Sequence, residues 1–441
     1  MIKRNNKKGF TIVELVIVIA VIAILAAVLI PTFAGIIRKA NISADTQLAK
    51  NLNSALAADE AIDGKPEDFT DVLAVFRENG YVVANLNPTA AGCYFVWESD
   101  SNQIILVDAK NDYEVIYASK DLANDKPCNT WYFAINDPDL VAEIEALNAE
   151  SVPNVLYTPK TQEALLDSFV QLQDKDGAQV VVVTEDLDLK KGGEIFKITK
   201  STANITVDLS GATVNCAGAV DTTVEFGKAD RAFTVETGAL TLVNGVVNAG
   251  DSYGTVKATN NAKVTVEDME LVNSLANGLN LKAIGADAVI DVADTTISAV
   301  LGGGCEAAGG TINLTNVTIN QTGFKDHCST AVAASGATGV ANVNSGTYTS
   351  ENVVLYVFSS GGTINVKSGT FVTTGNTLFT LTTQSGAKAD SVIKLSGGTF
   401  TCGNETKTFD TLDAEWLAKV TEGESSIEKV GNDWVITLAA K

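Results

Sequence analysis

The chain has 441 residues, of which 46% are hydrophobic and 19% are charged, and its formal net charge at pH 7 is −22. This length is enough for two or three domains, and the hydrophobic content excludes a wholly disordered chain. An acidic surface repels the phosphates of nucleic acid, so we expect no nucleic-acid partner. The six cysteines include no Cys-x-x-Cys pair and His327 is the single histidine. We therefore expect no metal and no cofactor.

The N-terminus combines a basic start with a long apolar run. Four cations between residues 3 and 8 precede residues 10–30, in which Glu14 is the one charged residue. A helix crosses hydrocarbon with about 20 such residues, and the positive-inside rule places a basic leader in the cytoplasm. We expect a single-pass transmembrane helix with the C-terminal domains extracellular, at the cell surface.

A short motif overlaps the start of this run. Gly9, Phe10, Thr11 and Glu14 stand in order before the apolar residues 15–30. This pattern resembles the type IV prepilin leader shared by pilins and by the pseudopilins of type II secretion. The resemblance implies that a prepilin peptidase removes residues 1–9, cleaving between Gly9 and Phe10, and N-methylates Phe10. It also implies that Glu14 pairs with the Phe10 amino group of a neighbouring pilin subunit, which would relieve the cost of a carboxylate in hydrocarbon.

A secretory signal peptide and a plain membrane anchor are the alternatives for this segment. A secretory signal has a shorter apolar core and a polar region around a small-x-small cleavage site. No polar cleavage region follows the small residues between 20 and 27. A plain anchor needs no Gly-Phe-Thr order and no Glu14, so we favour the prepilin interpretation.

Residues 10–58 read as one long pilin helix. Pro31 should end or kink its apolar first half, because proline removes a backbone donor and clashes with the preceding turn. After Pro31 the apolar residues recur at helical spacing: Ile36, Ile37, Ala40, Ala44, Leu48, Leu52, Ala55 and Leu56. We expect this stripe to pack on the first soluble domain.

Residues 59–157 indicate a small α+β unit. A helix should follow Pro66 and end near Gly80, a plausible C-cap. Strand-like runs at 93–97, 103–108 and 113–118 are separated by turn residues at 100–102 and 110–112. A short antiparallel sheet on a long N-terminal helix resembles the pilin head, and we expect Trp97 and Trp131 to be packing residues there.

Residues 158–441 contain a repeated β-pattern that follows an amphipathic helix at 161–172. Each repeat has two alternating apolar positions, a turn of two or three residues and another apolar position; the anchors are Leu209, Leu242, Val266, Val292, Leu314, Val343, Val366 and Leu395. The anchors are separated by 22 to 33 residues with no helical spacing between them, and repeats of this length predict a solenoid. We expect an all-β right-handed parallel β-helix, similar in architecture to the pectin-lyase-like superfamily. β-Propeller blades are longer, and a β-sandwich would not keep one motif in register.

The ends and the aromatic residues of this solenoid carry further expectations. Helix 161–172 should cap the N-terminal end, and Trp416 with residues 434–438 should close the other. Tyr348, Phe371 and Phe400 share one repeat position. They could form a sugar-binding ladder or an interior stack, and we favour the interior stack. We expect the asparagines of the repeats to satisfy backbone groups of turns.

Cysteine pairing and catalysis stay open at this point. Cys93 with Cys128 and Cys305 with Cys328 are possible disulfides outside the cell, and free buried cysteines are the alternative. The carboxylates that a polysaccharide-cleaving β-helix would need are represented by Asp186, Asp188, Asp287, Asp291 and Asp294. These alternate with apolar residues, as on a solvated strand face. Arg231 and the stretch 325–328 are the other polar features, and we identify no catalytic residue.

The sequence therefore predicts a transmembrane pilin helix, a small α+β head and a β-helix. We interpret the chain as a minor pilin or pseudopilin, whose helix assembles in a filament or membrane and whose β-helix is displayed for adhesion or glycan binding. Its expected partners are the prepilin peptidase, other pilin subunits, the membrane and extracellular glycans. The alternatives are a surface-tethered polysaccharide lyase or hydrolase and a pseudopilin of a secretion or DNA-uptake machine.

Overall fold

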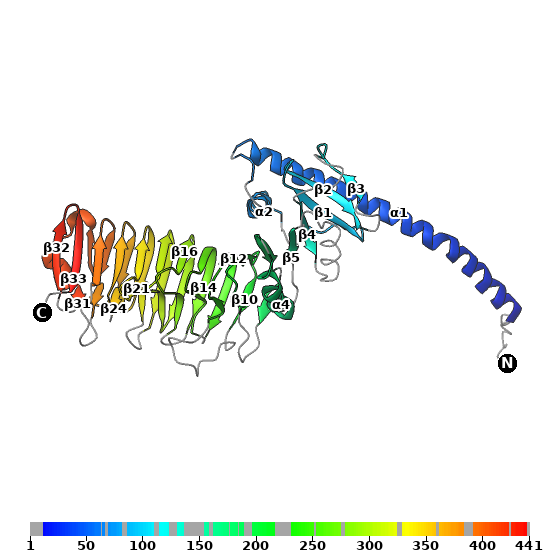
Figure 1. Ribbon diagram of the computed structural model, residues 1–441. Helices are drawn as coiled ribbons and strands as arrows, with labels where there is room; N and C mark the ends of the chain where they lie inside the picture. The colour runs from blue at the N-terminus through cyan, green and yellow to red at the C-terminus, as the bar shows by residue number, and fades with distance from the viewer. Residues whose placement is uncertain are drawn as a thin grey trace, which may run out of the picture. The chain divides into compact units, whose positions relative to one another are not determined.

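A computed structural model gives the fold of the chain (Figure 1). It describes residues 12–438 except 63, 67–68, 82–85, 110–113, 123–129, 136–153, 158–161, 176, 184, 189–195, 217–230, 251–252, 275–277, 324–328, 359–360, 383–390 and 423–424. The described chain forms two compact units: the first extends to Ala134, and the second contains the residues from Val155 onward.

The first unit is a long helix with a small antiparallel sheet. Its elements are α1 (Ile12–Glu60), α2 (Phe69–Glu78), β1 (Cys93–Glu98), β2 (Gln103–Asp108), β3 (Glu114–Tyr117) and β4 (Thr130–Ile135). The strands pair in the order β3-β2-β1-β4. The long N-terminal helix, the helix after Pro66 and the three predicted strands are confirmed. Helix α1 continues through Pro31, so this residue does not end the helix; a kink there stays a prediction.

The C-terminal half of α1 and all of α2 bury their apolar sides in this unit. Leu52 and Leu56 of α1 and Phe76 of α2 are almost fully buried. Trp97 is buried as predicted, lies 5.8 Å from the Phe69 ring between ring centroids, and donates its indole N–H to Asn102. Gly80 ends α2 with φ +80°, a conformation that favours glycine, so the predicted C-cap is confirmed.

The predicted apolar stripe of α1 is only partly buried. Its residues near the C-terminus pack in the head, but Ile36 and Ile37 are 57% and 59% exposed. Ala40 and Ala44 of the stripe are exposed as well, so the expectation that the whole stripe packs on the head is wrong for these four residues. Arg38, one residue further along, is ion-paired with Asp108 of β2, and the buried side of α1 begins with Asp45.

The second unit is a parallel β-solenoid whose strands form three stacked rows. The first sheet contains β6 (Gln179–Val182), β9 (Asn204–Asp208), β16 (Val289–Ala293), β19 (Thr311–Thr315), β22 (Val340–Val343), β25 (Gly362–Val366) and β28 (Ser391–Leu395). The second contains β7 (Leu187–Asp188), β10 (Thr213–Asn215), β17 (Thr296–Val300), β20 (Val317–Thr322), β23 (Gly346–Ser350), β26 (Thr370–Thr373) and β29 (Thr399–Cys402). Two long strands, β12 (Ala239–Gly250) and β14 (Lys263–Asn273), take part in both sheets.

The third sheet completes each turn. It contains β8 (Phe196–Ile198), β11 (Phe233–Val235), β13 (Val256–Thr259), β15 (Leu279–Ile284), β18 (Gly303–Ala308), β21 (Thr330–Ser335), β24 (Val353–Phe358), β27 (Phe379–Leu381) and β31 (Thr421–Glu422). The strands within each of the three rows pair in parallel (Figure 1). The predicted parallel β-solenoid is thus confirmed, and its right-handed winding stays a prediction.

The repeat anchors lie in one column of the first sheet. Seven anchors, from Leu242 to Leu395, pair with one another in the predicted order. The first anchor is corrected: Leu242 pairs with Val207 and not with Leu209. Four residues lie between β9 and β10, whereas two residues form the equivalent turn inside β12. The motif of the first repeat is therefore shifted by two residues relative to the second.

The turn between the first and second sheets uses a left-handed residue in successive coils. Asn244, Asp268, Asp294 and Asn316 have φ between 47° and 60°. In the later coils the residue with positive φ is a glycine one register position further on, Gly346, Gly369 or Gly398, with φ between 115° and 130°. Asparagine, aspartate and glycine tolerate this conformation better than other residues. At Gly346 a Cβ atom would also lie 2.1 Å from the Val317 carbonyl oxygen, so the close approach of two strands requires glycine.

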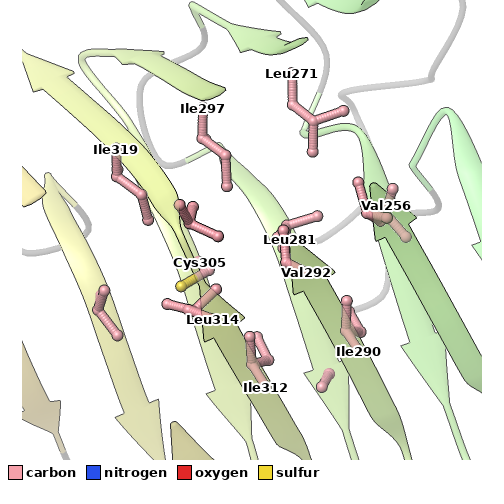
Figure 2. Packing of buried hydrophobic residues seen from close by; sticks show 14 of the residues in the cluster. Val256, Leu271, Leu281, Ile290, Val292, Ile297, Cys305, Ile312, Leu314 and Ile319 are labelled. Atoms are coloured by element: carbon pink, nitrogen blue, oxygen red, sulfur yellow. The ribbon is translucent and has the colours of Figure 1, made fainter. Parts of the chain in front are cut away.

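The interior is filled by columns of apolar side chains, one residue per coil. Figure 2 shows Leu271, Ile297 and Ile319, which follow one another on adjacent strands of the second sheet. The same column continues through Tyr348, Phe371 and Phe400, which are fully buried. Adjacent rings stack with centroids 5.1 Å and 5.0 Å apart. The interior stack is confirmed, and the rings are not a surface ladder for sugars.

Both ends of the solenoid are covered. Helix α4 (Gln162–Leu172) buries Leu165 and Phe169 against the first coils, with Phe169 5.1 Å from Phe196 between centroids. At the other end α5 (Ala414–Lys419) buries Trp416, and β33 (Asp433–Leu438) pairs antiparallel with β28 and with β32 (Ser425–Val430). Strand β30 (Glu405–Thr408) pairs antiparallel with β29. The two predicted caps are confirmed, and antiparallel strands close the parallel ladders.

Candidate functional site

The first half of α1 presents apolar side chains on every side. The large apolar residues described between Ile12 and Ile37 are between 47% and 81% exposed; they are Ile12, Leu15, Val16, Ile17, Val18, Ile19, Val21, Ile22, Ile24, Leu25, Leu29, Ile30, Phe33, Ile36 and Ile37. A continuous exposed apolar surface of this kind marks an interaction site.

The residues of the prepilin motif lie at the start of this helix. The backbone of Glu14 is in the first turn of α1, while Gly9 and Phe10 lie outside the described residues. The pairing of Glu14 with Phe10 therefore stays a prediction. Within the part of the chain that is described, no helix meets the length and hydropathy of a membrane-spanning segment, so the predicted transmembrane span is not confirmed.

Three polar residues of α1 hold the helix to the head. Arg38 bonds to the Asp108 carboxylate and to the Ala91 carbonyl. The buried carboxylate of Asp45 accepts the backbone N–H groups of Thr89 at 2.8 Å and Ala90 at 2.9 Å. These contacts lie on the side of α1 that faces the head, and they fix which part of the helix stays uncovered.

The third of these residues, Asn53, binds strand β2 of the head sheet. Its amide accepts the N–H of Ile104 at 2.7 Å and donates to the carbonyl of Ile104 at 2.8 Å. Sequence reasoning missed Arg38, Asp45 and Asn53. The signal was a polar residue at intervals along an otherwise apolar helical stripe, where a buried polar group needs a partner.

The cysteines proposed for disulfides are free thiols where they are described. Cys93 and Cys305 are buried and unpaired with sulfur, while Cys128 and Cys328 lie outside the described residues. The two disulfides therefore stay predictions. Burial raises the pKa of the Cys305 thiol to about 12, and burial, followed by the charge of Asp108, raises the pKa of the Cys93 thiol. Both thiols are protonated at neutral pH, which makes them poor nucleophiles.

Four of the five carboxylates considered for catalysis accept hydrogen bonds from a neighbouring coil. Asp291 accepts the side-chain N–H of Asn313 at 2.6 Å, and Asp188 accepts that of Asn215 at 2.9 Å. Asp186 accepts the backbone N–H of Thr213 at 2.8 Å. Asp294 occupies a left-handed turn position and accepts an N–H from Asn316, while Asp287 is exposed in a turn.

Asparagines extend the first of these contacts into an amide ladder. Asn342 donates to Asn313 at 2.7 Å, and Asn365 donates to Asn342 at 2.9 Å. These three residues lie on strands of the first sheet, so the expectation that the repeat asparagines serve backbone groups of turns is wrong for them. Asn248 fits that expectation, because its side chain accepts the N–H of Gly250.

The remaining polar features do not form an exposed cluster in the described chain. Arg231 is fully buried and donates its Nε–H to the Leu279 carbonyl. Residues 325–328, including His327, lie outside the described residues. Among the described residues no group of three or more His, Cys, Asp and Glu side chains is arranged to hold a metal.

Sequence reasoning missed one buried ion pair in the third sheet. Lys282 Nζ lies 2.8 Å from a Glu306 carboxylate oxygen, and Ser335 donates to the other oxygen at 2.6 Å. The register places Lys282 beside Glu306 on adjacent strands, so the pair links two coils. Removing one partner of such a buried pair is strongly destabilising.

Comparison with known proteins agrees with the motif at the N-terminus. Residues 4–30 match the family described as the prokaryotic N-terminal methylation motif. The chain is 53% identical over 56 residues to the type IV wide pilus major component PilA4 of Thermus thermophilus, covering 13% of this chain and 40% of that protein. It is 42% identical over 87 residues to a fimbrial protein of Moraxella nonliquefaciens, covering 20% and 46%.

A third relative is the type IV major pilin protein PilE1 of Neisseria gonorrhoeae, 36% identical over 96 residues, covering 18% of this chain and 53% of that protein. The chain thus spans about half the length, or less, of the curated relatives it matches. No solved structure matches it. The protein carries a prepilin-type methylation motif on a type IV pilin-like N-terminus and joins it to a parallel β-solenoid.

Proposed function

We propose that the chain is an exported pilin-like subunit that assembles through α1 and displays its solenoid at the cell surface. The observation that carries this proposal is the uncovered apolar half of α1, which begins at the methylation motif. In water this surface is unfavourable, at about 25 cal/mol per Å² of apolar area left exposed. Lipid would cover it before assembly, and the helices of other pilin subunits would cover it afterwards.

Processing by a prepilin peptidase would supply the charge that the helix needs. Cleavage after Gly9 frees the Phe10 amino group, and N-methylation leaves that amine cationic. Insertion scales give a cost of about 2.5–3.5 kcal/mol for a charged side chain at the centre of a membrane helix; Glu14 lies near one end, where this value is an upper bound. A cationic amine from a neighbouring subunit would offset this cost, so Glu14 favours ordered assembly over free diffusion in lipid.

The solenoid supports a minor, outward-facing role. It comprises the residues from Val155 onward, a large addition to a pilin-like helix and head. Repeating such a bulk on every subunit would crowd a densely packed shaft. Four of the five carboxylates considered for catalysis are bonded between coils, so we propose that the solenoid binds extracellular glycans or surfaces and does not cleave them.

The test is to isolate surface filaments from cells that express the full chain and to sequence the N-terminus of the subunit. The expected result is a chain that begins at N-methylated Phe10 and sediments with the filaments. Glu14→Leu should still be cleaved and inserted but should be absent from filaments. Asp59→Leu, near the C-terminal end of the same helix, is the matched control and should assemble normally.

Two results would contradict this proposal. A mature chain that begins well beyond Pro31 would show that the apolar segment is a discarded export signal. Equal incorporation of the Glu14→Leu and unaltered chains would show that the carboxylate plays no part in assembly.

A further inference from the structure

A row of threonines runs across the outer face of the second sheet. Strand pairing aligns Thr296, Thr318, Thr347, Thr370 and Thr399 on five adjacent strands. Each is followed in sequence by a residue of the buried column, so alternation turns the threonine side chains outward. None of the five is buried. Adjacent strands are about 4.8 Å apart, so the row is about 19 Å long.

The hydroxyl groups of this threonine row are available. In the described part of the chain, no hydrogen bond from these five hydroxyls to another protein group is present, whereas Asn313, Asn342 and Asn365 of the first sheet bond to one another. The asparagine ladder therefore uses its polar groups within the fold. The threonine row leaves its donors and acceptors to solvent or to a ligand.

A second row lies beside it, two residues further along each strand. It contains Ser298, Asn320, Thr349, Val372 and Thr401, which are half-buried or exposed. Together the two rows form a regular surface of hydroxyl, amide and methyl groups. Because the sheet fixes every strand, this surface is preorganised and requires no ordering when a ligand binds.

The surface is also uncharged, unlike the chain as a whole. The five strands that carry it contain no Asp, Glu, Lys or Arg, although the chain has a net charge of −22. The coils after Thr296 follow the same trend: residues 307–404 contain seven charged residues in 98, four lysines and three acidic residues, against 19% charged residues overall. On the other side of Thr296 the register continues to the exposed Glu270, where the uncharged surface ends. The five strands themselves offer no charged side chain to attract phosphate or sulfate.

We propose that the threonine row binds an uncharged, linear polysaccharide laid across the strands. This inference rests on the proposed display of the solenoid at the cell surface. Sugar hydroxyls both donate and accept hydrogen bonds, as threonine hydroxyls do. A row of identical groups at one spacing gains cumulative affinity only from a ligand that repeats, because each further contact becomes intramolecular once the first has formed.

The test measures binding of the full chain, in detergent micelles, to insoluble polysaccharides. Microcrystalline cellulose and mannan are the uncharged probes, and immobilised polygalacturonate is the charged one. The unaltered chain should be depleted from solution by at least one uncharged probe and not by polygalacturonate. The double variant Thr318→Val/Thr370→Val should lower the association constant about tenfold or more, since two hydrogen-bonding groups are lost.

The matched control is Thr311→Val/Thr363→Val, which alters the outer face of the first sheet in the same coils. Valine keeps the branched shape that suits a strand, so both double variants should fold. Equal loss of binding in the two variants would overturn the proposal, as would a preference for polygalacturonate. A chain that assembles into filaments but binds neither uncharged probe would overturn it while leaving the assembly role standing.

Discussion

Isoleucine, leucine and valine are abundant in two regions of this molecule, where their side chains have opposite exposure to solvent. In the first half of α1 they point outward, and Ile24 is 68% exposed. In the solenoid they point inward, and Ile319 is fully buried. Burying one such side chain is worth about 1.5–3 kcal/mol. The solenoid gains this energy within one chain, whereas in the proposed assembly α1 gains it from lipid or from other subunits.

The difference follows from geometry. Each coil of the solenoid covers the coil before it, and the α4 and α5 caps cover the ends. Among the described residues, the first half of α1 has no such neighbour, because its contacts with the head begin near Arg38. The comparison predicts that substitutions in the solenoid change stability and that substitutions in the first half of α1 change assembly.

The largest effect should come from removing an aromatic ring in the solenoid column. Phe371→Ala leaves a cavity between Tyr348 and Phe400, whose rings stack on it at 5.1 Å and 5.0 Å. We expect a loss of about 3–5 kcal/mol in the free energy of unfolding. Urea denaturation followed by the fluorescence of Trp416 and Trp434 measures it.

The neighbouring half-buried Val372 provides the control for this experiment. Val372→Ala should cost less than about 1 kcal/mol, because the side chain lies on the outer face. Equal losses for the two variants would show that the aromatic column does not form the core of these coils.

A smaller effect should follow from breaking the contact between α1 and the head. Asp45→Ala leaves the N–H groups of Thr89 and Ala90 without their acceptor, and Ala90 is buried. We expect a loss of about 2–3 kcal/mol, since hydrogen bonds to a charged group are lost. Hydrogen exchange at the two amides should accelerate.

Asp45→Asn removes the charge of this contact but keeps one acceptor oxygen. Its loss in the free energy of unfolding should therefore be smaller than that of Asp45→Ala. Unchanged amide exchange in both variants would mean that the Asp45 contact does not hold the helix to the head.

Sequence reasoning succeeded where one physical pattern repeats over many residues. Alternation along each strand places seven anchors in one column and Tyr348, Phe371 and Phe400 in another, so fold class and interior could be predicted. The threonine row was visible in the same aligned segments, one residue before each buried residue. Its significance required the register, which shows that the hydroxyls lie side by side and unbonded.

Features that depend on contacts distant in sequence could not be predicted. Ile36 and Ile37 continue the apolar pattern of α1 but stay exposed, and the contacts of α1 with the head begin at Arg38. Asn313 and Asn342 bond across 29 residues, so no local turn signal reports their ladder. Leu209 is two residues away from the anchor column because one turn contains two extra residues, and an alignment by motif does not detect such an insertion.

A small effect on stability is expected from a substitution in the C-terminal cap of the solenoid. Asp413 is the N-cap of α5, and its bond from the Trp416 backbone N–H lowers the pKa of this carboxyl from 3.8. Because the folded pKa lies below the unfolded one, the stabilisation is present above about pH 3.8 and is lost as the pH falls through the folded value. Asp413→Ala should lower the urea midpoint slightly at pH 7. At a pH below the folded pKa the two chains should converge. A difference that persists there would mean that the cap does not act through the ionised carboxylate.

The smallest effect on stability should come from the exposed half of α1. Ile24→Ala should change the free energy of unfolding by no more than about 0.5 kcal/mol, since the side chain is 68% exposed. Leu52→Ala, in the same helix but fully buried against the head, should cost about 2–5 kcal/mol. Among chains that remain folded, filament incorporation should fall more for Ile24→Ala than for Leu52→Ala, because Ile24 lies on the surface that we propose other subunits cover. A destabilised Ile24→Ala subunit would mean that this half of the helix is already packed within its own chain, and the contrast between the two regions would fail.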